Sequence, residues 1–299
     1  MRMDDFELIP FSNTGVAYNT LSFSINNSIN PKMGASNKYM SYKSVDDIVY
    51  YDLPTPFTEL MYRSVFEQGQ LLDATYSVNT SRQFNFSISR KGLRSLGNYQ
   101  NFLSNSSNFS FTTNYFSKNK KFKLRTHYAN QKLFSEQNGG ISDSDISSFE
   151  NGDNQFLDRG VFDPNFENAH NEFLGKRFYS DQSYKLKEKD SLISTSLELF
   201  NSISFEEKNY KFQQNTSNEF FGASFTPQEI NDKIFLNTFN LESGFILESD
   251  SYGKFNLGLR YTTDRYFMEN FQIDEYVDNS QEINSKTTFF SGSYSNQIS

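Results

Sequence analysis

The chemistry open to this 299-residue chain is limited by its two histidines and by the absence of cysteine. Nucleophilic catalysis needs a base such as histidine beside a serine or cysteine. His127 lies between Arg125 and Ala129 in an alternating stretch, and His170 lies in "ENAHNEF", which lacks the His-Glu-x-x-His spacing of a zinc site. The sequence therefore predicts no catalytic residue, no metal site and no cofactor.

An acidic stretch, "SDSDISSFENGD" at 142–153, offers carboxylates that could hold Ca²⁺ through oxygen ligands. It lacks the glycine and terminal glutamate placement of an EF-hand loop. A solvated acidic loop explains this composition better than a calcium site does.

A basic row is the strongest chemical signal in the sequence. Lys123, Arg125 and His127 alternate with a set of mostly apolar residues that begins at Phe122 and Leu124. If the apolar set faces lipid, the basic set faces a lumen, where rings of basic side chains favour anions. We expect Arg90 and Arg260 to project into the same space. The alternative is that acids such as Asp181 and Glu242 neutralise the row and leave a weakly selective pore.

Such a row needs extended strands to position it, and alternation with a period of two recurs along the chain. In "QFNFSIS" (83–89), three apolar side chains lie on one face and small polar ones on the other. This pattern fits a soluble sandwich or an outer-membrane barrel. On the barrel interpretation, the expected lipid-facing residues are Phe84, Phe86, Ile88, Phe109, Phe111, Phe122 and Leu124. We also predict a four-stranded antiparallel meander over 71–129, with turns near 80–82 and 117–120.

The connections favour the barrel. Short polar turns alternate with long segments near 91–107, 130–176, 204–232 and 264–286, and long loops are uncommon in compact soluble domains. Long loops gathered at one end of an up-and-down sheet are typical of outer-membrane barrels. The predicted fold is all-β, an antiparallel up-and-down meander that forms part of a transmembrane barrel. Residues 1–55 would lead into it, and 56–299 would form the partial barrel.

Composition agrees with this prediction. The chain has 33 Phe and 18 Tyr although only 36% of its residues are hydrophobic, which suits strands better than membrane helices or disorder. A formal net charge of −8 argues against nucleic acid as a partner.

Longer stretches carry a family resemblance. "FEQGQLLD", "NTS", "FNFSI" and "GLRSLG" follow one another within 54–97, and similar stretches include "FENGDNQFLDRG" and "GKRFYSDQSY". These motifs resemble the family called the "putative porins" of Bacteroidetes outer membranes. The resemblance implies a diffusion channel in the bacterial outer membrane, with membrane lipid, small polar solutes and the barrel-assembly machinery as partners. The N-terminus lacks the apolar region of an export signal, so we expect an internal or truncated piece of such a barrel.

Two other functions compete. The barrel of a TonB-dependent receptor would need a plug domain, for which 1–55 is short and irregular. A secreted or surface-exposed β-rich adhesion protein would explain the acidic loops without a membrane. An adhesion protein should be soluble without detergent, whereas a barrel should need detergent or lipid to fold.

Overall fold

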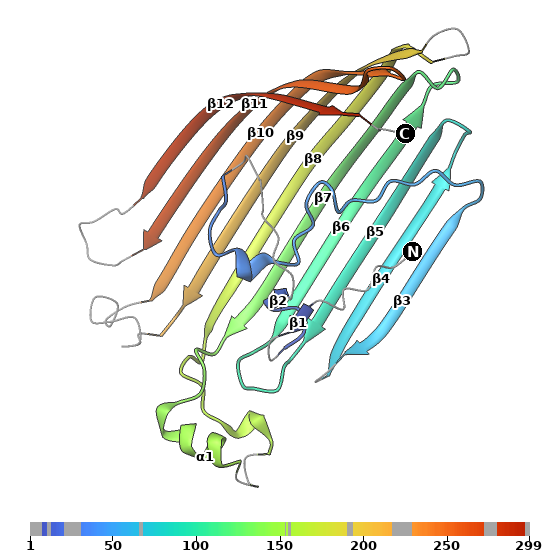
Figure 1. The fold of residues 1–299 in the computed structure, drawn as a ribbon. Helices are drawn as coiled ribbons and strands as arrows, with labels where there is room; N and C mark the ends of the chain where they lie inside the picture. The colour runs from blue at the N-terminus through green and yellow to red at the C-terminus, as the bar shows by residue number, and fades with distance from the viewer. Residues whose placement is uncertain are drawn as a thin grey trace.

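The computed structural model describes residues 8–10, 13–20, 31–65, 68–152, 154, 157–189, 194–216, 229–271 and 280–296. Its main feature is a ten-stranded antiparallel sheet in which each strand pairs with its neighbours in the chain (Figure 1). The strands are β3 Phe57–Val65, β4 Gly69–Asn79, β5 Phe84–Ser95, β6 Ser104–Phe116, β7 Phe122–Gln137, β8 Ala169–Lys187, β9 Thr195–Gln214, β10 Ile230–Ser249, β11 Gly253–Phe271 and β12 Gln281–Ser295. The predicted all-β fold, an antiparallel up-and-down meander, is confirmed.

The predicted meander over 71–129 is also confirmed. It comprises β4 to β7, with connections at 80–83 and 117–121 and no helix within it. In the described part of the chain, the edge strands β3 and β12 do not pair with each other, so the sheet is open. No helix among the described residues is long and apolar enough to cross a bilayer.

The long connections join strand ends at one end of the sheet, and they are shorter than the sequence predicts. The strands leave 96–103, 138–168, 215–229 and 272–280 between them instead of 91–107, 130–176, 204–232 and 264–286. The connection 138–168 contains a short helix, α1 (Ile146–Asn151), between the 3-10 turns η2 (Asp143–Asp145) and η4 (Arg159–Val161). The strands continue past the ends expected from the sequence. Beyond those ends the large apolar side chains lie on the inner face, so the outward alternation that predicted the strands is lost there.

This change of sides divides the sheet into two halves. Near the short turns, large apolar side chains such as Leu199, Leu241 and Phe245 are exposed on the outer face. Toward the long loops, the outer face carries charged pairs such as Lys132 with Glu172, while the inner face carries Leu133, Phe173, Tyr210 and Leu236. A loss of outward apolar alternation therefore marks the end of the outer apolar zone and not the end of the strands.

The height of the outer apolar zone fits a membrane. On β10 it extends from Phe239 to Leu247, which spans about 27 Å along the strand at roughly 3.4 Å per residue. A tilt of about 40° reduces this to about 21 Å, close to the apolar band of roughly 25 Å in outer-membrane barrels.

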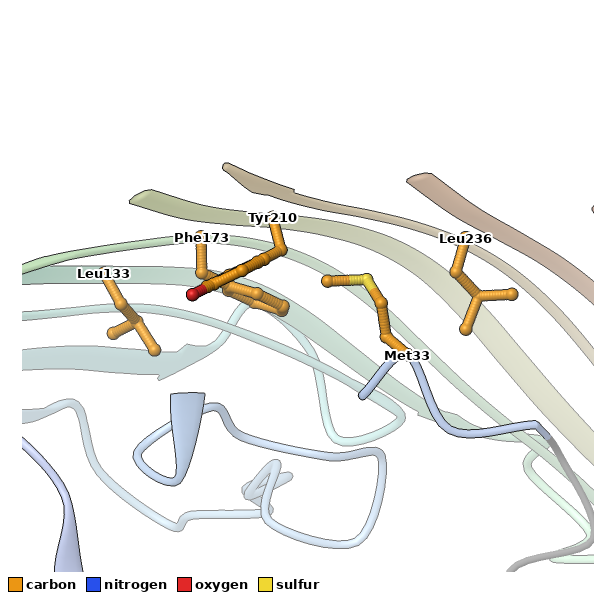
Figure 2. Close-up of a cluster of buried hydrophobic side chains, with 5 residues drawn as sticks. All are labelled: Met33, Leu133, Phe173, Tyr210 and Leu236. Atoms are coloured by element: carbon orange, nitrogen blue, oxygen red, sulfur yellow. The ribbon is translucent and has the colours of Figure 1, made fainter. Parts of the chain in front are cut away.

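An N-terminal segment crosses the inner, concave face of the sheet. We call residues 31–56 the strap; it contains the 3-10 helix η1 (Ser36–Tyr39) and leads directly into β3 (Figure 1). Met33 of the strap packs beneath Leu133, Phe173, Tyr210 and Leu236, which hang from four adjacent strands (Figure 2). A two-stranded ribbon precedes the strap, formed by β1 (Leu8–Pro10) and β2 (Tyr18–Thr20).

Candidate functional site

Between the apolar cluster and the short turns, the inner face is polar across most of the sheet. Residues directly opposite one another on paired strands lie on the same face, so the register defines rows across the sheet. The row through His127 contains only polar side chains from β4 to β11. They are Ser77, Ser87, Thr112, His127, Tyr179, Ser204, Asn240 and Thr262. Hydroxyl and amide groups of this kind can line a hydrated space.

The neighbouring row holds charges that are already paired. Arg125 donates through Nε to Oδ1 of Asp181 at 3.0 Å, and a second nitrogen also contacts this carboxylate. Arg260 donates to Oε2 of Glu242 through Nε at 3.0 Å and through Nη2 at 2.6 Å. The expected basic row therefore carries its own counter-ions.

The structure places the expected lumen residues as follows. Lys123, Arg125, His127 and Arg260 lie on the inner face, and the Lys123 ammonium sits over the Phe116 ring at 5.6 Å. Arg90 is a correction: it lies on the outer face, directly opposite Phe109. The reason is parity, because Arg90 is an even number of residues from Phe84 and Ile88. It lies just beyond the apolar zone, where a charge on the outer face meets water.

The seven residues expected to face lipid share one side of the sheet. The register sets Phe84 opposite Tyr115, Ile88 opposite Phe111, and Leu124 opposite Tyr115, all on the face away from the strap. Phe86, Phe109 and Phe122 have the same parity on their strands. Contact of this face with lipid remains a prediction.

Where the strap crosses the polar rows, a buried arginine joins it to the ten-stranded sheet, which we call the wall. Arg177 on β8 is 2% exposed and pairs with Glu206 on β9 at 3.0 Å. Its Nη2 donates to the backbone carbonyls of Lys43 and Ser44, at 3.1 and 2.8 Å. A buried guanidinium is stabilised only when it is paired and hydrogen-bonded, and the strap supplies part of that requirement.

His127 is fully buried in the same network. Nε of Arg177 lies 2.9 Å from Nε2 of His127, and because arginine can only donate, Nε2 must accept. The proton of the neutral ring is then on Nδ1, which lies 2.6 Å from the hydroxyl of Tyr50 in the strap. This arrangement uses both ring nitrogens for structure.

Tyr42 completes the connection from the strap side. Its hydroxyl donates to Oε1 of Glu206 at 2.5 Å, and its ring packs edge-on against Phe173. Burial, together with the nearby Glu206 carboxylate, raises the pKa of Tyr42 well above its ordinary value, so the hydroxyl stays protonated. We call Tyr42, Tyr50, His127, Arg177 and Glu206 the latch.

Further contacts hold the strap along its length. The side-chain amide of Gln131 exchanges two hydrogen bonds with the backbone of Lys43, at 2.8 and 2.9 Å. Asn114 donates to the carbonyl of Tyr51 at 3.0 Å, and Asn79 accepts from the amide of Leu53 at 3.2 Å. The strap is thus bound to the wall from β4 to β9.

A cavity of about 620 Å³ remains between the strap and strands β8 to β11. Tyr39, Asp46 and Lys32 line it from the strap, and Ser202, Asn240 and Arg260 line it from the wall. Most of its lining groups can donate or accept hydrogen bonds, so the space between strap and wall is suited to water and polar solutes.

The acidic loop uses its carboxylates locally. Oδ2 of Asp145 accepts from the amide of Asp163 at 3.1 Å, and Oδ1 of Asp158 accepts from the amide of Gly160 at 2.9 Å. Asp153 lies outside the described residues. Within the described part of the chain, no group of three or more histidines, aspartates and glutamates could hold a metal ion.

Sequence reasoning did not find the latch. Glu206 lies inside the predicted loop 204–232, and Arg177 directly follows the predicted loop 130–176. Glu206 lies four residues after Ser202, and Arg177 lies four residues before Asp181, so each shares a strand face with another polar residue. This continuation of the inner polar pattern was the available signal.

Comparison with known proteins gives one family match. A family model described as "Putative porin" matches residues 1–299. The fold is similar to that of the ferric citrate transporter FecA in its unliganded form, with 8% identity and a TM-score of 0.39, covering 82% of this chain and 42% of that one. It is also similar to the ferric-catecholate import receptor Fiu from E. coli in its closed form, with 8% identity and a TM-score of 0.41, covering 81% and 47%. The chain thus spans less than half the length of either structure, and no curated protein matches its sequence significantly.

Proposed function

The chain belongs to the family described as "Putative porin", a β-barrel protein of the bacterial outer membrane, and from this premise we propose that it forms a water-filled channel for passive diffusion of small polar solutes. The observation that carries the proposal is the pairing of an outer apolar zone with inner rows of hydroxyl, amide and balanced charged groups at the same height. Barrels that contain aqueous channels alternate in this way. No covalent step is part of this function.

A secreted adhesion protein fits the outer face less well. Large side chains such as Leu60, Phe205 and Phe290 are exposed at 71%, 47% and 87%. In water, an apolar surface of this extent would favour aggregation or a partner. In lipid it is the stable arrangement, so the channel is the better-supported function.

The test is conductance of the full-length protein in planar bilayers, with swelling of vesicles in small sugars as a second readout. Stepwise currents and sugar-dependent swelling are expected. Protein that folds in vesicles and gives neither would contradict the proposal.

The paired charges lead to an expected result for ion selectivity. We expect the wild-type pore to discriminate weakly between anions and cations, because Arg125 and Arg260 are neutralised by Asp181 and Glu242. Replacing Lys123 and Arg125 with Gln leaves Asp181 without its counter-ion, so the reversal potential under a salt gradient should move toward cation preference. Lys132→Gln on the outer face is the control and should change nothing. An unchanged reversal potential in the double variant would remove this row from selectivity.

The distribution of loops leads to an expected membrane orientation. In outer-membrane barrels, long loops face the exterior and short turns face the periplasm. A protease added to intact cells should therefore cleave first within 138–168, where Leu157 is 73% exposed. The turn at 117–121, at the other end of the sheet, should be protected. Cleavage at that turn while 138–168 stays intact would invert the proposed orientation.

A further inference from the structure

The outer apolar zone is interrupted by polar side chains in two neighbouring rows. In the row through Leu124, β8, β9 and β10 carry Gln182, Asn201 and Ser243. The same row is apolar or aromatic on both sides of them. Its other members are Phe84, Tyr115, Leu124, Leu259 and Phe290. In the next row, Ser180 on β8 is followed by Thr126 on β7 and Thr113 on β6, and the hydroxyl oxygens of Ser180 and Thr126 lie 3.0 Å apart. We call Ser180, Gln182, Asn201 and Ser243 the amide patch.

The amide patch lies in the middle of the apolar zone. On β9, Leu199 lies on one side of Asn201 along the outer face, with Ile203 and Phe205 on the other. Lipid headgroups at either interface are therefore out of reach, and acyl chains offer no hydrogen bonds. Polar groups left without partners in hydrocarbon are costly, and polar residues at this depth are rare without a function.

The patch satisfies itself only in part. Nδ2 of Asn201 donates to Oγ of Ser243 at 2.6 Å and to the carbonyl of Glu242 at 3.1 Å. Nε2 of Gln182 donates to Oδ1 of Asn201 at 3.4 Å. Among the described residues, Oε1 of Gln182 accepts no hydrogen bond, and this exposed side chain points away from the sheet. The patch therefore keeps capacity for an external partner.

The surface is also hollowed at the patch. A depression of about 310 Å³ is lined by Gln182, Asn201 and Ser243 and bordered by the larger Phe122, Tyr184 and Leu199. A hollow lined by hydrogen-bonding side chains gives room for a neighbouring protein surface in a membrane, where packing and hydrogen bonds drive association.

We propose that the amide patch is the contact surface within the bilayer for a second copy of this chain, related by a two-fold axis. Serine, asparagine and glutamine side chains each contain donors and acceptors and carry no charge. Two identical patches facing each other can therefore satisfy one another, as an isologous interface requires. The bordering rings would pack around the hydrogen-bonded centre. This inference rests on the outer-membrane position of the protein and not on conduction.

The test uses the absence of cysteine from the sequence. Ser180→Cys introduces one thiol at the patch, and Val78→Cys introduces one in the same outer row on β4, four strands away. After oxidation of outer membranes containing the full-length protein, Ser180→Cys should give a disulfide-linked homodimer and Val78→Cys should not. A Ser180→Cys protein that remains monomeric, or that links to a different protein, would overturn the proposal.

A second measurement addresses the hydrogen bonds themselves. Gln182→Leu with Asn201→Leu makes the patch match its apolar neighbours, so the barrel should still fold in lipid. The dissociation constant of the dimer, measured by sedimentation in density-matched detergent, should rise about tenfold or more. This corresponds to the loss of one or two hydrogen bonds between membrane-embedded segments. Folded leucine variants that dimerise like the wild type would also overturn it. Conductance in these variants reports separately on the channel.

Discussion

Glu206→Gln should lower the free energy of unfolding by about 3–5 kcal/mol, the range for a buried ion pair that loses one member. Arg177 would remain in the wall at 2% exposure with no carboxylate beside its Nη1. Tyr42 would also lose its charged acceptor, which loosens the strap. The measurement is equilibrium unfolding in guanidinium of the full-length protein folded in lipid vesicles, followed by circular dichroism because the chain has no tryptophan.

Two further variants make this result specific. Glu172→Gln removes a carboxylate of a solvent-exposed pair on the outer face, and should cost only about 0–1 kcal/mol. Replacing both Arg177 and Glu206 with Met should recover part of the loss, because the buried guanidinium is then removed together with its counter-ion. Equal losses for Glu206→Gln and Glu172→Gln would show that the latch does not hold the fold together.

Displacing the strap should raise the single-channel conductance by a factor of about two or more, since segments inside a barrel reduce its open cross-section. Gly175 gives a way to do this without deleting any residue. A Cβ atom at Gly175 would lie 2.5 Å from Cε2 of Tyr42, so Gly175→Leu must push the Tyr42 ring off the wall. Planar-bilayer recordings of the full-length protein would measure the change.

The matched control is Gly92→Leu, where the nearest atom to an added Cβ is at an ordinary contact distance of 3.9 Å. It lies on the outer face of β5 and should leave conductance unchanged. A variant lacking residues 31–50 sets the upper limit for a pore without its strap. If this variant conducts like the wild type, the strap does not narrow the conducting path.

Sequence patterns predicted the half of the sheet near the short turns well and the half near the long loops poorly. Over β4 to β7, apolar side chains such as Phe84 and Leu124 alternate with small polar ones, and this local signal determines both strand and face. Beyond Tyr128 the outer face turns toward water, so Lys132 and Glu172 replace rings and the expected alternation disappears. Arg90 was misplaced for the same reason, since a charged residue was assumed to face inward.

The strap and the latch could not be predicted from local patterns. Residues 31–56 have no period, because an irregular segment is held by single hydrogen bonds to several strands. Arg177 meets His127 and Glu206 only through strand pairing, and Lys43 only through the path of the strap. Such contacts depend on the whole fold, whereas the paired charges of Arg125 and Arg260 could be anticipated from nearby acids.

The position of the strap also constrains how the protein is built. It precedes β3 in the chain and yet lies on the concave side of every strand that it touches. Lipid does not tolerate unpaired strand edges, so the sheet must meet partner strands to complete a cylinder. Once that cylinder has formed, a segment bearing Tyr39, Tyr42 and Tyr50 would have to be threaded through its mouth. Laying the strap down first and curling the sheet around it avoids this, so we expect the strap to take its place before the sheet closes.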